Sequence, residues 1–378
     1  MMQLLNVERL FDGESWHQHI EVQIEEGVIR SLKPTDPDFC DGILVPGFID
    51  LQVNGGGGVL FNASPTLDTL RRMVRAHARY GTVALLPTLI TDDLRVMERA
   101  ADTLSEAIAS AEPGVLGLHF EGPHLSAPKK GVHPQQHIRP LSERELAIYA
   151  RQDIGIKLVT VAPECVPPEQ IRQLIEQQVT VFLGHSNADA ETVLAAIDAG
   201  ARGFTHLYNA MSPLTSREPG MVGVALVDQS TWCGIILDGH HMHPLAARLA
   251  LQSKPQGKLL LVTDAMSPVG TDDQHFDLFG EQVTRQNLQL TNSRGQLAGS
   301  ALDMASAVRY AINQLDVSED EALRMASRYP AQCLGLSAGF LRKSDAASMV
   351  LLDQNWQVQQ CWINGMCLPA VDKELLIC

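Results

Sequence analysis

The stretch VLGLHFEGP, residues 115–123, decides the fold. Its first part is a continuous apolar run, which is typical of a strand buried on both faces of a parallel sheet. The run ends in the carboxylate of Glu121, and Gly122 and Pro123 then turn the chain away. An α/β barrel places its functional groups at the carboxyl ends of such strands. The stretch therefore predicts a barrel strand with a functional acid at its end.

Seven further runs of this kind recur along the chain, and most precede a stretch with helical periodicity. They are PGFIDLQVN (46–54), TVALLPTL (82–89), IKLVTVAPE (156–164), TVFLGHS (180–186), GFTHLYN (203–209), WCGIILDG (232–239) and KLLLVTDA (258–265). In one helical stretch, Asn187 and Asp189 are candidate caps and Gly200 a candidate end. Eight strand–helix repeats predict an α/β fold, a (β/α)8 TIM barrel.

The two ends of the chain show a different pattern. Residues 17–34 alternate apolar and polar side chains around a Glu-Gly turn, and residues 346–368 look similar, with an Asn-Gly turn at 364–365. Period-two alternation with such turns is typical of β-hairpins. We therefore predict a small β-sandwich domain built from both termini, residues 1–45 and 344–378, around a barrel over residues 46–343.

Composition narrows the possible partners and the compartment. The formal charge of −15 argues against nucleic acid and against anionic membranes. The sequence has no apolar run of about 18 residues and no signal layout at its start, so we expect a cytoplasmic protein. The seven cysteines are scattered without a C-x-x-C pair, which argues against a disulfide framework.

Polar side chains stand at the predicted carboxyl ends of all eight strands. They are Gln52, Asn54, Thr88, Glu121, Glu164, His185, His206, Asp238, His240, His241 and Asp264. One Glu with two His suits a catalytic divalent metal that keeps an open position. Asp264 could accept a proton from the attacking water and deliver it to a leaving group. Singly, each residue is also compatible with a packing histidine or a helix cap; together, at equivalent positions, they favour a metal site.

The first strand lacks the His-x-His that a binuclear barrel hydrolase usually carries there. It offers Gln52 and Asn54 instead, and amides are poor zinc ligands. We therefore expect one main metal ion.

Ten motifs occur in the order in which one known family carries them. They are PGFIDLQVNG, LHFEGPHL, KKGVH, APE, GHSNA, THLYNAM, REPG, DGHH, VTDAM and LAGSALDM, between residues 46 and 304. The chain thus resembles the amidohydrolase superfamily and, within it, the N-acetylglucosamine-6-phosphate deacetylases. The NGGGG loop lacks the Cys of many relatives, which argues against a second metal site that uses it.

The resemblance implies a role for each site residue. Glu121, His185 and His206 would hold the metal, and Asp264 would be the general base and then acid. His133 would reach the acetamido group. The substrate-binding set would be Val132, His133, Asn209, Ala210, Arg217, His241, Leu297, Ala298 and Gly299. From the residues alone, His133 could belong to a solvated basic loop, Arg217 could pair with Glu218, and His240 could replace His241 at the phosphate.

The implied reaction is metal-dependent hydrolysis of N-acetyl-D-glucosamine 6-phosphate to D-glucosamine 6-phosphate and acetate, in amino-sugar catabolism. The galactosamine epimer is the alternative substrate, and the Gln-x-Asn first strand favours the gluco sugar. A cyclic amidase or nucleobase deaminase would normally show His-x-His, and an inactive relative would lack metal ligands or Asp264. One zinc ion per subunit is expected, with iron as the alternative. We expect a homodimer or homotetramer, in which Arg217 or His241 could serve either its own subunit or a neighbour.

Overall fold

The computed structural model describes residues 2–369, and its centre is an eight-stranded parallel sheet. The strands are β5 (Phe48–Val53), β8 (Thr82–Ile90), β9 (Gly117–Glu121), β10 (Ile156–Val161), β11 (Val179–Leu183), β12 (Gly203–Phe204), β13 (Trp232–Ile235) and β14 (Leu259–Leu261). They lie side by side in sequence order, each at one of the predicted positions. The prediction of a (β/α)8 barrel is confirmed.

The sheet closes where β14 meets β5. The Asp264 N–H donates to the Gln52 carbonyl at 3.0 Å, and the Asn54 N–H donates to the Ala265 carbonyl at 2.8 Å. Deeper in the barrel, the Thr263 hydroxyl donates to the buried carboxylate of Asp50 at 2.5 Å. These contacts join the first and last barrel strands just below their carboxyl ends.

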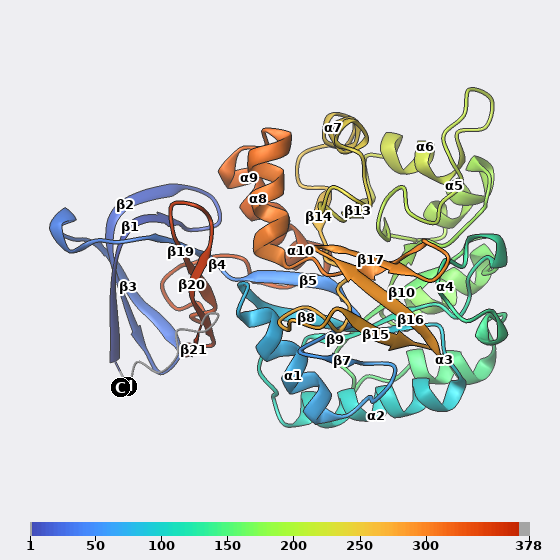
Figure 1. The fold of residues 1–378 in the computed structure, drawn as a ribbon, viewed down its shortest axis with the longest axis horizontal. Helices are drawn as coiled ribbons and strands as arrows, with labels where there is room; N and C mark the ends of the chain where they lie inside the picture. The colour runs from blue at the N-terminus through green and yellow to red at the C-terminus, as the bar shows by residue number, and fades with distance from the viewer. Residues whose placement is uncertain (1, 370–378) are drawn as a thin grey trace.

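Helices follow most of the barrel strands and cover the outside of the barrel (Figure 1). They are α1 (Leu67–Ala78), α2 (Leu94–Ala109), α3 (Glu143–Tyr149), α4 (Pro168–Glu176), α5 (Ala190–Asp198), α6 (Gly220–Val227), α7 (Pro244–Ser253), α8 (Met304–Leu315), α9 (Glu319–Ala326) and α10 (Arg328–Cys333). Of the two candidate caps for α5, Asp189 is the one whose side chain accepts the N–H of Thr192, at 2.9 Å. Gly200 follows the helix with a φ of 111°.

The terminal strands form a seven-stranded sheet beside the barrel, at the left of Figure 1. Its order is β21 (Met366–Pro369), β20 (Val358–Ile363), β19 (Met349–Leu352), β4 (Ile43–Pro46), β1 (Met2–Phe11), β2 (Trp16–Glu25) and β3 (Val28–Pro34). Both predicted two-residue turns are present, because Glu26-Gly27 and Asn364-Gly365 have positive φ values between flanking strands. The domain boundaries at 45/46 and 343/344 stay a prediction, and residues 370–378 of the second segment lie outside the described residues.

An antiparallel sheet that the sequence did not predict is inserted after β14. Its strands are β15 (His275–Leu278), β16 (Glu281–Gln286), β17 (Gln289–Asn292) and β18 (Leu297–Ser300). It packs through a small apolar cluster onto Ile90 and Met266, which lie at the carboxyl end of the barrel. A short hairpin, β6 (Gly55–Gly56) and β7 (Val59–Leu60), follows β5. Within the described part of the chain, no helix is both long and apolar enough to cross a membrane.

Candidate active site

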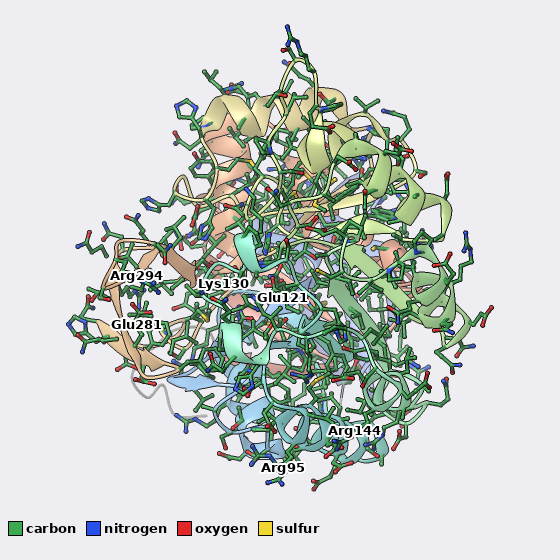
Figure 2. The ribbon with its side chains drawn as sticks, turned by 90° about the vertical axis from the view of Figure 1, so that its right-hand side faces the viewer. Arg95, Glu121, Lys130, Arg144, Glu281 and Arg294 are labelled. Carbon is green, nitrogen blue, oxygen red and sulfur yellow. The ribbon has the colours of Figure 1, made fainter. Side chains whose placement is uncertain are left out.

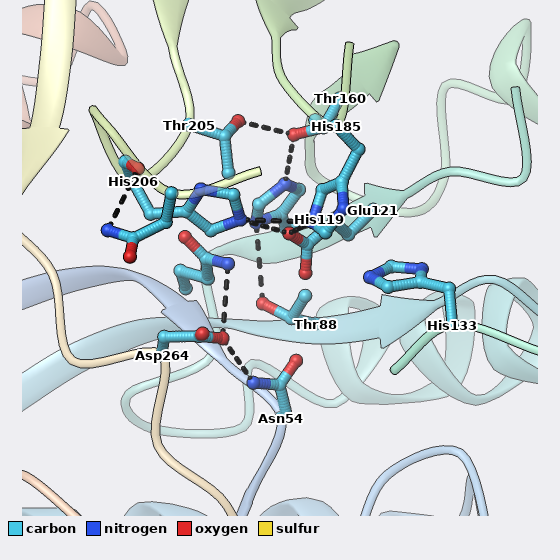
Figure 3. A network of polar contacts seen from close by, with 12 residues as sticks. Asn54, Thr88, His119, Glu121, His133, Thr160, His185, Thr205, His206 and Asp264 are labelled. Carbon is cyan, nitrogen blue, oxygen red and sulfur yellow. Dashed lines mark hydrogen bonds and ion pairs between the residues drawn. The ribbon is translucent and has the colours of Figure 1, made fainter. Parts of the chain in front are cut away.

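Three side chains converge at the carboxyl end of the barrel (Figure 3). Glu121 is the last residue of β9, and His185 and His206 each lie two residues beyond β11 and β12. Glu121 Oε1 is 3.0 Å from His185 Nε2 and 2.9 Å from His206 Nε2, and the two histidine nitrogens are 3.0 Å apart. All three side chains are buried. Their donor atoms therefore face one common point, as metal ligands do.

The hydrogen bonding around His185 fits a cation at that point. Its Nδ1 lies 2.9 Å from the Lys129 carbonyl, which can only accept, so Nδ1 carries the proton. In its neutral form, His185 presents the lone pair of Nε2 to the Glu121 carboxylate, an arrangement that is repulsive unless a proton or a metal ion lies between them. The donor set thus fits a divalent metal.

The backbone at the strand ends turns these side chains inward. His185, His206 and Asp264 have φ values of 49°, 34° and 52°, in the left-handed region that residues other than glycine rarely adopt. Such conformations cost free energy and cluster at functional sites. Three of them at equivalent barrel positions support a functional rather than a packing role.

Asp264 lies beside the candidate metal ligands. Its Oδ1 accepts hydrogen bonds from Gln52 Nε2 at 3.1 Å and Asn54 Nδ2 at 2.6 Å. Burial, together with the negative charge of Glu121, raises the pKa of Asp264 to about 6. A carboxyl group with a pKa near neutrality suits a group that first accepts and then donates a proton.

His133 is buried beside His185, with ring centroids 4.4 Å apart, and so it does not belong to a solvated loop. The backbone N–H of Thr91 donates to its Nδ1 at 3.3 Å, and the Thr91 hydroxyl lies 2.8 Å from the same atom. Since Nδ1 accepts, Nε2 carries the hydrogen and is a donor. Burial and the nearby His185 hold the pKa of His133 well below its usual value, which keeps the ring neutral.

A cavity of about 160 Å³ connects these groups. It is lined by Ile90, Glu121, Gly131, Val132, His133, His185, His206, Asn209, Ala210, His241, Asp264, Met266, Leu297 and Gly299. Ile90, Gly131 and Met266 were not predicted as site residues, because an apolar side chain or a glycine carries no chemical signal of its own. In Figure 2, Glu121 and Lys130 appear near the centre of the view, and Glu281 and Arg294 of the four-stranded sheet appear to one side.

Two predicted substrate residues do not line this cavity. Ala298 is buried in the apolar cluster of the four-stranded sheet, between Leu297 and Gly299, which do line it. Arg217 is exposed on the loop before α6. Its neighbour Glu218 accepts the N–H groups of Ala190 and Gly220 at 2.8 and 2.9 Å, so it serves the loop backbone.

The structure distinguishes between the two adjacent histidines. His241 lines the cavity, and its Nδ1 donates to Asp238 Oδ2 at 2.6 Å. The backbone N–H groups of His240 and His241 both donate to Asp238 Oδ1 at 2.8 Å. His240 itself is exposed. The geometry therefore favours His241 as the group that faces a ligand.

The other strand-end residues have structural contacts. Glu164 accepts hydrogen bonds from the Ser186 hydroxyl and the Asn187 N–H, at 2.6 and 2.7 Å. The Thr88 hydroxyl accepts the N–H of Val53 at 2.9 Å.

A larger cavity of about 340 Å³ lies at the opposite end of the barrel, near Glu112 and Asp345, but no histidine lines it. Among the described residues, the candidate metal ligands and Asp264 converge around the smaller cavity.

An α/β barrel with a Glu-His-His cluster and a buried aspartate at its strand ends has the layout of a metal-dependent hydrolase. The family comparison agrees, because the model of the amidohydrolase family matches residues 43–368. The chain belongs to this family.

Named relatives are similar over nearly the whole chain. The N-acetylgalactosamine-6-phosphate deacetylase of Shewanella sp. (strain ANA-3) is 51% identical and covers 94% of this chain and 93% of its own. The human N-acetylglucosamine-6-phosphate deacetylase is 37% identical over 86% of this chain and 83% of its own. The crystal structure of N-acetylglucosamine-6-phosphate deacetylase from Pasteurella multocida is 32% identical, with a TM-score of 0.92 over 98% of this chain and 100% of that one.

Proposed function

We propose that this protein hydrolyses the acetamide of N-acetyl-D-glucosamine 6-phosphate to give D-glucosamine 6-phosphate and acetate. The observation that carries the proposal is the convergence of Asp264, His133 and the Glu-His-His cluster on one cavity. The human and Pasteurella relatives bear the name of this activity, which supports it.

The residues present supply what amide hydrolysis needs. Glu121, His185 and His206 would hold one divalent ion, which when bound polarises a carbonyl and acidifies water. Asp264 takes a proton from the attacking water as the new C–O bond forms. It then gives that proton to the nitrogen, so that the C–N bond breaks and a neutral amine leaves. The Nε2–H of His133 donates to the carbonyl oxygen as negative charge develops there.

The remaining cavity residues would bind the sugar phosphate. We assign Val132, Asn209, Ala210, Leu297 and Gly299 to the sugar, and His241 to the phosphate. The phosphate lies away from the reacting carbon, so its binding would position the acetamide. The roles predicted for Arg217 and Ala298 stay predictions, and neither residue lines the cavity of its own chain.

The second candidate substrate is N-acetyl-D-galactosamine 6-phosphate. This chain is 51% identical to the Shewanella enzyme of that name over 94% of its length, and this similarity favours the galacto sugar. The sequence argument for the gluco sugar was the Gln-x-Asn strand, but Gln52 and Asn54 bond to Asp264 and do not line the cavity. They therefore carry no information about the C4 hydroxyl that distinguishes the epimers.

The remaining parts of the proposal rest on the sequence. We propose zinc as the metal, with iron as the alternative, because a Glu-His-His set accepts either ion. We further propose a cytoplasmic homodimer or homotetramer.

The test is acetate release from both N-acetylated hexosamine 6-phosphates, with metal-loaded wild type beside Asp264→Asn. Release from the gluco sugar, lost in the variant, is the expected result. A higher kcat/KM for the galacto sugar would replace the first substrate with the second candidate. Absence of release from both sugars, with metal bound, would overturn the proposed function.

A further inference from the structure

We propose that Gln52 and Asn54 are positioning residues that hold Oδ1 of Asp264, so that Oδ2 is the only oxygen that accepts the proton of the attacking water. The proposal rests on the proposed function, because it assigns the pair to the same reaction. The two amides occupy the positions where the sequence lacks His-x-His, and neither the metal cluster nor the cavity uses them.

Strand geometry directs both amides to one oxygen. Gln52 and Asn54 are two residues apart in sequence, so their side chains leave the β5 region on the same side. Each is 2% exposed, and their NH2 groups lie 3.1 and 2.6 Å from Asp264 Oδ1. An ionised carboxylate only accepts, which assigns the amide nitrogens, rather than the oxygens, to these contacts. Both hydrogen bonds therefore end on Oδ1, and no described residue donates to Oδ2.

The main chain of Asp264 is held between β5 and β18. Its N–H donates to the Gln52 carbonyl and its carbonyl accepts the N–H of Ser300, both at 3.0 Å. The φ of 52° at Asp264 is held by these contacts. The backbone and one carboxylate oxygen of Asp264 are thus both held by hydrogen bonds, which leaves the side chain little freedom to rotate.

Orientation of this kind acts on the chemical step. A buried carboxylate that can rotate presents either oxygen to the water, and only part of the population is in a reactive geometry. Two donors on Oδ1 also stabilise the anion against burial and the charge of Glu121. Loss of the donors should therefore lower kcat, whereas KM should change little because the amides do not touch the cavity.

The experiment compares Gln52→Met, Asn54→Leu and the double variant with wild type, since both replacements keep the side-chain volume but remove the donor. We expect kcat for acetate release to fall about tenfold to a hundredfold in each single variant, with KM within about twofold and the metal content unchanged. Because both amides act on one oxygen, the double variant should deviate from the product of the single effects. Gln52→Glu, which keeps the shape but does not donate when ionised, replaces Gln52→Met if that variant fails to fold.

Thr103→Val is the matched control. The Thr103 hydroxyl, on α2, donates a buried hydrogen bond of 2.7 Å to the Pro65 carbonyl. The valine variant loses this hydrogen bond, so its melting temperature should fall while its kcat stays unchanged. Unchanged kcat in the Gln52 and Asn54 variants would overturn the proposal. A fall in kcat that is matched by an equal loss of bound metal would also overturn it, and so would a change in KM alone. Failure of wild type on both sugars would instead overturn the proposed function, so the two failures are distinguishable.

Discussion

At the scale of single residues, Thr91 sets the proton position of His133. Its hydroxyl lies 2.8 Å from Nδ1, while its backbone N–H donates to the same atom from 3.3 Å. We expect Thr91→Val to lower kcat about tenfold, the low end for a residue that orients another through a hydrogen bond. Thr91→Ser should restore most of the rate because it restores the hydroxyl. Equal kcat in the valine and serine variants would show that the hydroxyl plays no part.

The glycine beside this contact has no room for a side chain. Gly122 has a φ of 86°, and a Cβ atom there would lie 2.2 Å from the Thr91 hydroxyl oxygen. The Gly-Pro pair after Glu121 therefore does more than end the strand, because it leaves space for the residue that orients His133. The sequence showed the turn but not this contact, which joins segments about thirty residues apart.

A buried histidine makes stability depend on pH. His77 is fully buried and donates from Nε2 to the Gly55 carbonyl at 2.8 Å, and burial lowers its pKa to about 4. Its pKa in the unfolded chain is about 6.5. The unfolded chain therefore takes up a proton first as pH falls below about 6.5, so this group lowers the free energy of unfolding by about 2 kcal/mol at pH 5.

The measurement compares urea unfolding of wild type and His77→Gln at about pH 8 and about pH 5. The variant keeps a donor for the Gly55 carbonyl but has no ionisable ring. On acidification its free energy of unfolding should therefore fall by about 2 kcal/mol less than that of wild type. The same acid-induced loss in both proteins would contradict the assignment.

At the scale of elements, the two candidate caps of α5 give a direct comparison. Asp189 accepts the N–H of Thr192, whereas Asn187 uses its own backbone N–H to reach Glu164. Asp189→Ala should lower the free energy of unfolding by about 1 kcal/mol, the usual contribution of a helix cap. Asn187→Ala should have a smaller effect, and kcat should stay unchanged in the Asp189 variant. A larger loss for Asn187→Ala in thermal or urea unfolding would reverse the assignment.

Elements with a strong local sequence pattern were predictable, and the inserted four-stranded sheet was not. The eight barrel strands are continuous apolar runs, which local sequence reveals directly. The short strands β15 to β18 are mostly polar, because they bury only a small apolar cluster against the barrel end. Their position over the cavity depends on tertiary contacts with Ile90 and Met266, which no local pattern contains.

The site was predictable to the extent that it follows the barrel rule. Glu121, His185, His206 and Asp264 stand at strand ends in sequence, and the structure brings them together. The hydrogen-bond partners of Asp264 and of His133 were not predictable. Gln52 and Thr91 reach them through hydrogen bonds whose distances depend on how the strands are staggered.

At the scale of the whole molecule, removal of the metal should separate activity from folding. The three candidate ligands lie at the end of a barrel whose apolar core does not depend on them. Treatment with a chelator should therefore abolish acetate release and lower the melting temperature, because an ion that binds only the folded state stabilises it. The circular dichroism spectrum at room temperature should stay unchanged.

Addition of zinc or iron to the chelated protein should restore both properties, and the ion that gives the higher kcat at equal occupancy identifies the better cofactor. Full activity in protein from which metal analysis detects no ion would contradict the assignment of Glu121, His185 and His206.

The contacts between β14 and β5 have a consequence for the order in which function arises during folding. The three candidate ligands lie at or just beyond the ends of β9, β11 and β12, so a partly folded intermediate with only the middle strands paired would already contain a complete ion-binding set. The proposed proton-transfer group is complete only when the first and last strands meet, since Gln52 and Asp264 are 212 positions apart. Such an intermediate would bind metal but have no activity. The time at which activity appears during refolding would therefore mark the closure of the barrel between β14 and β5.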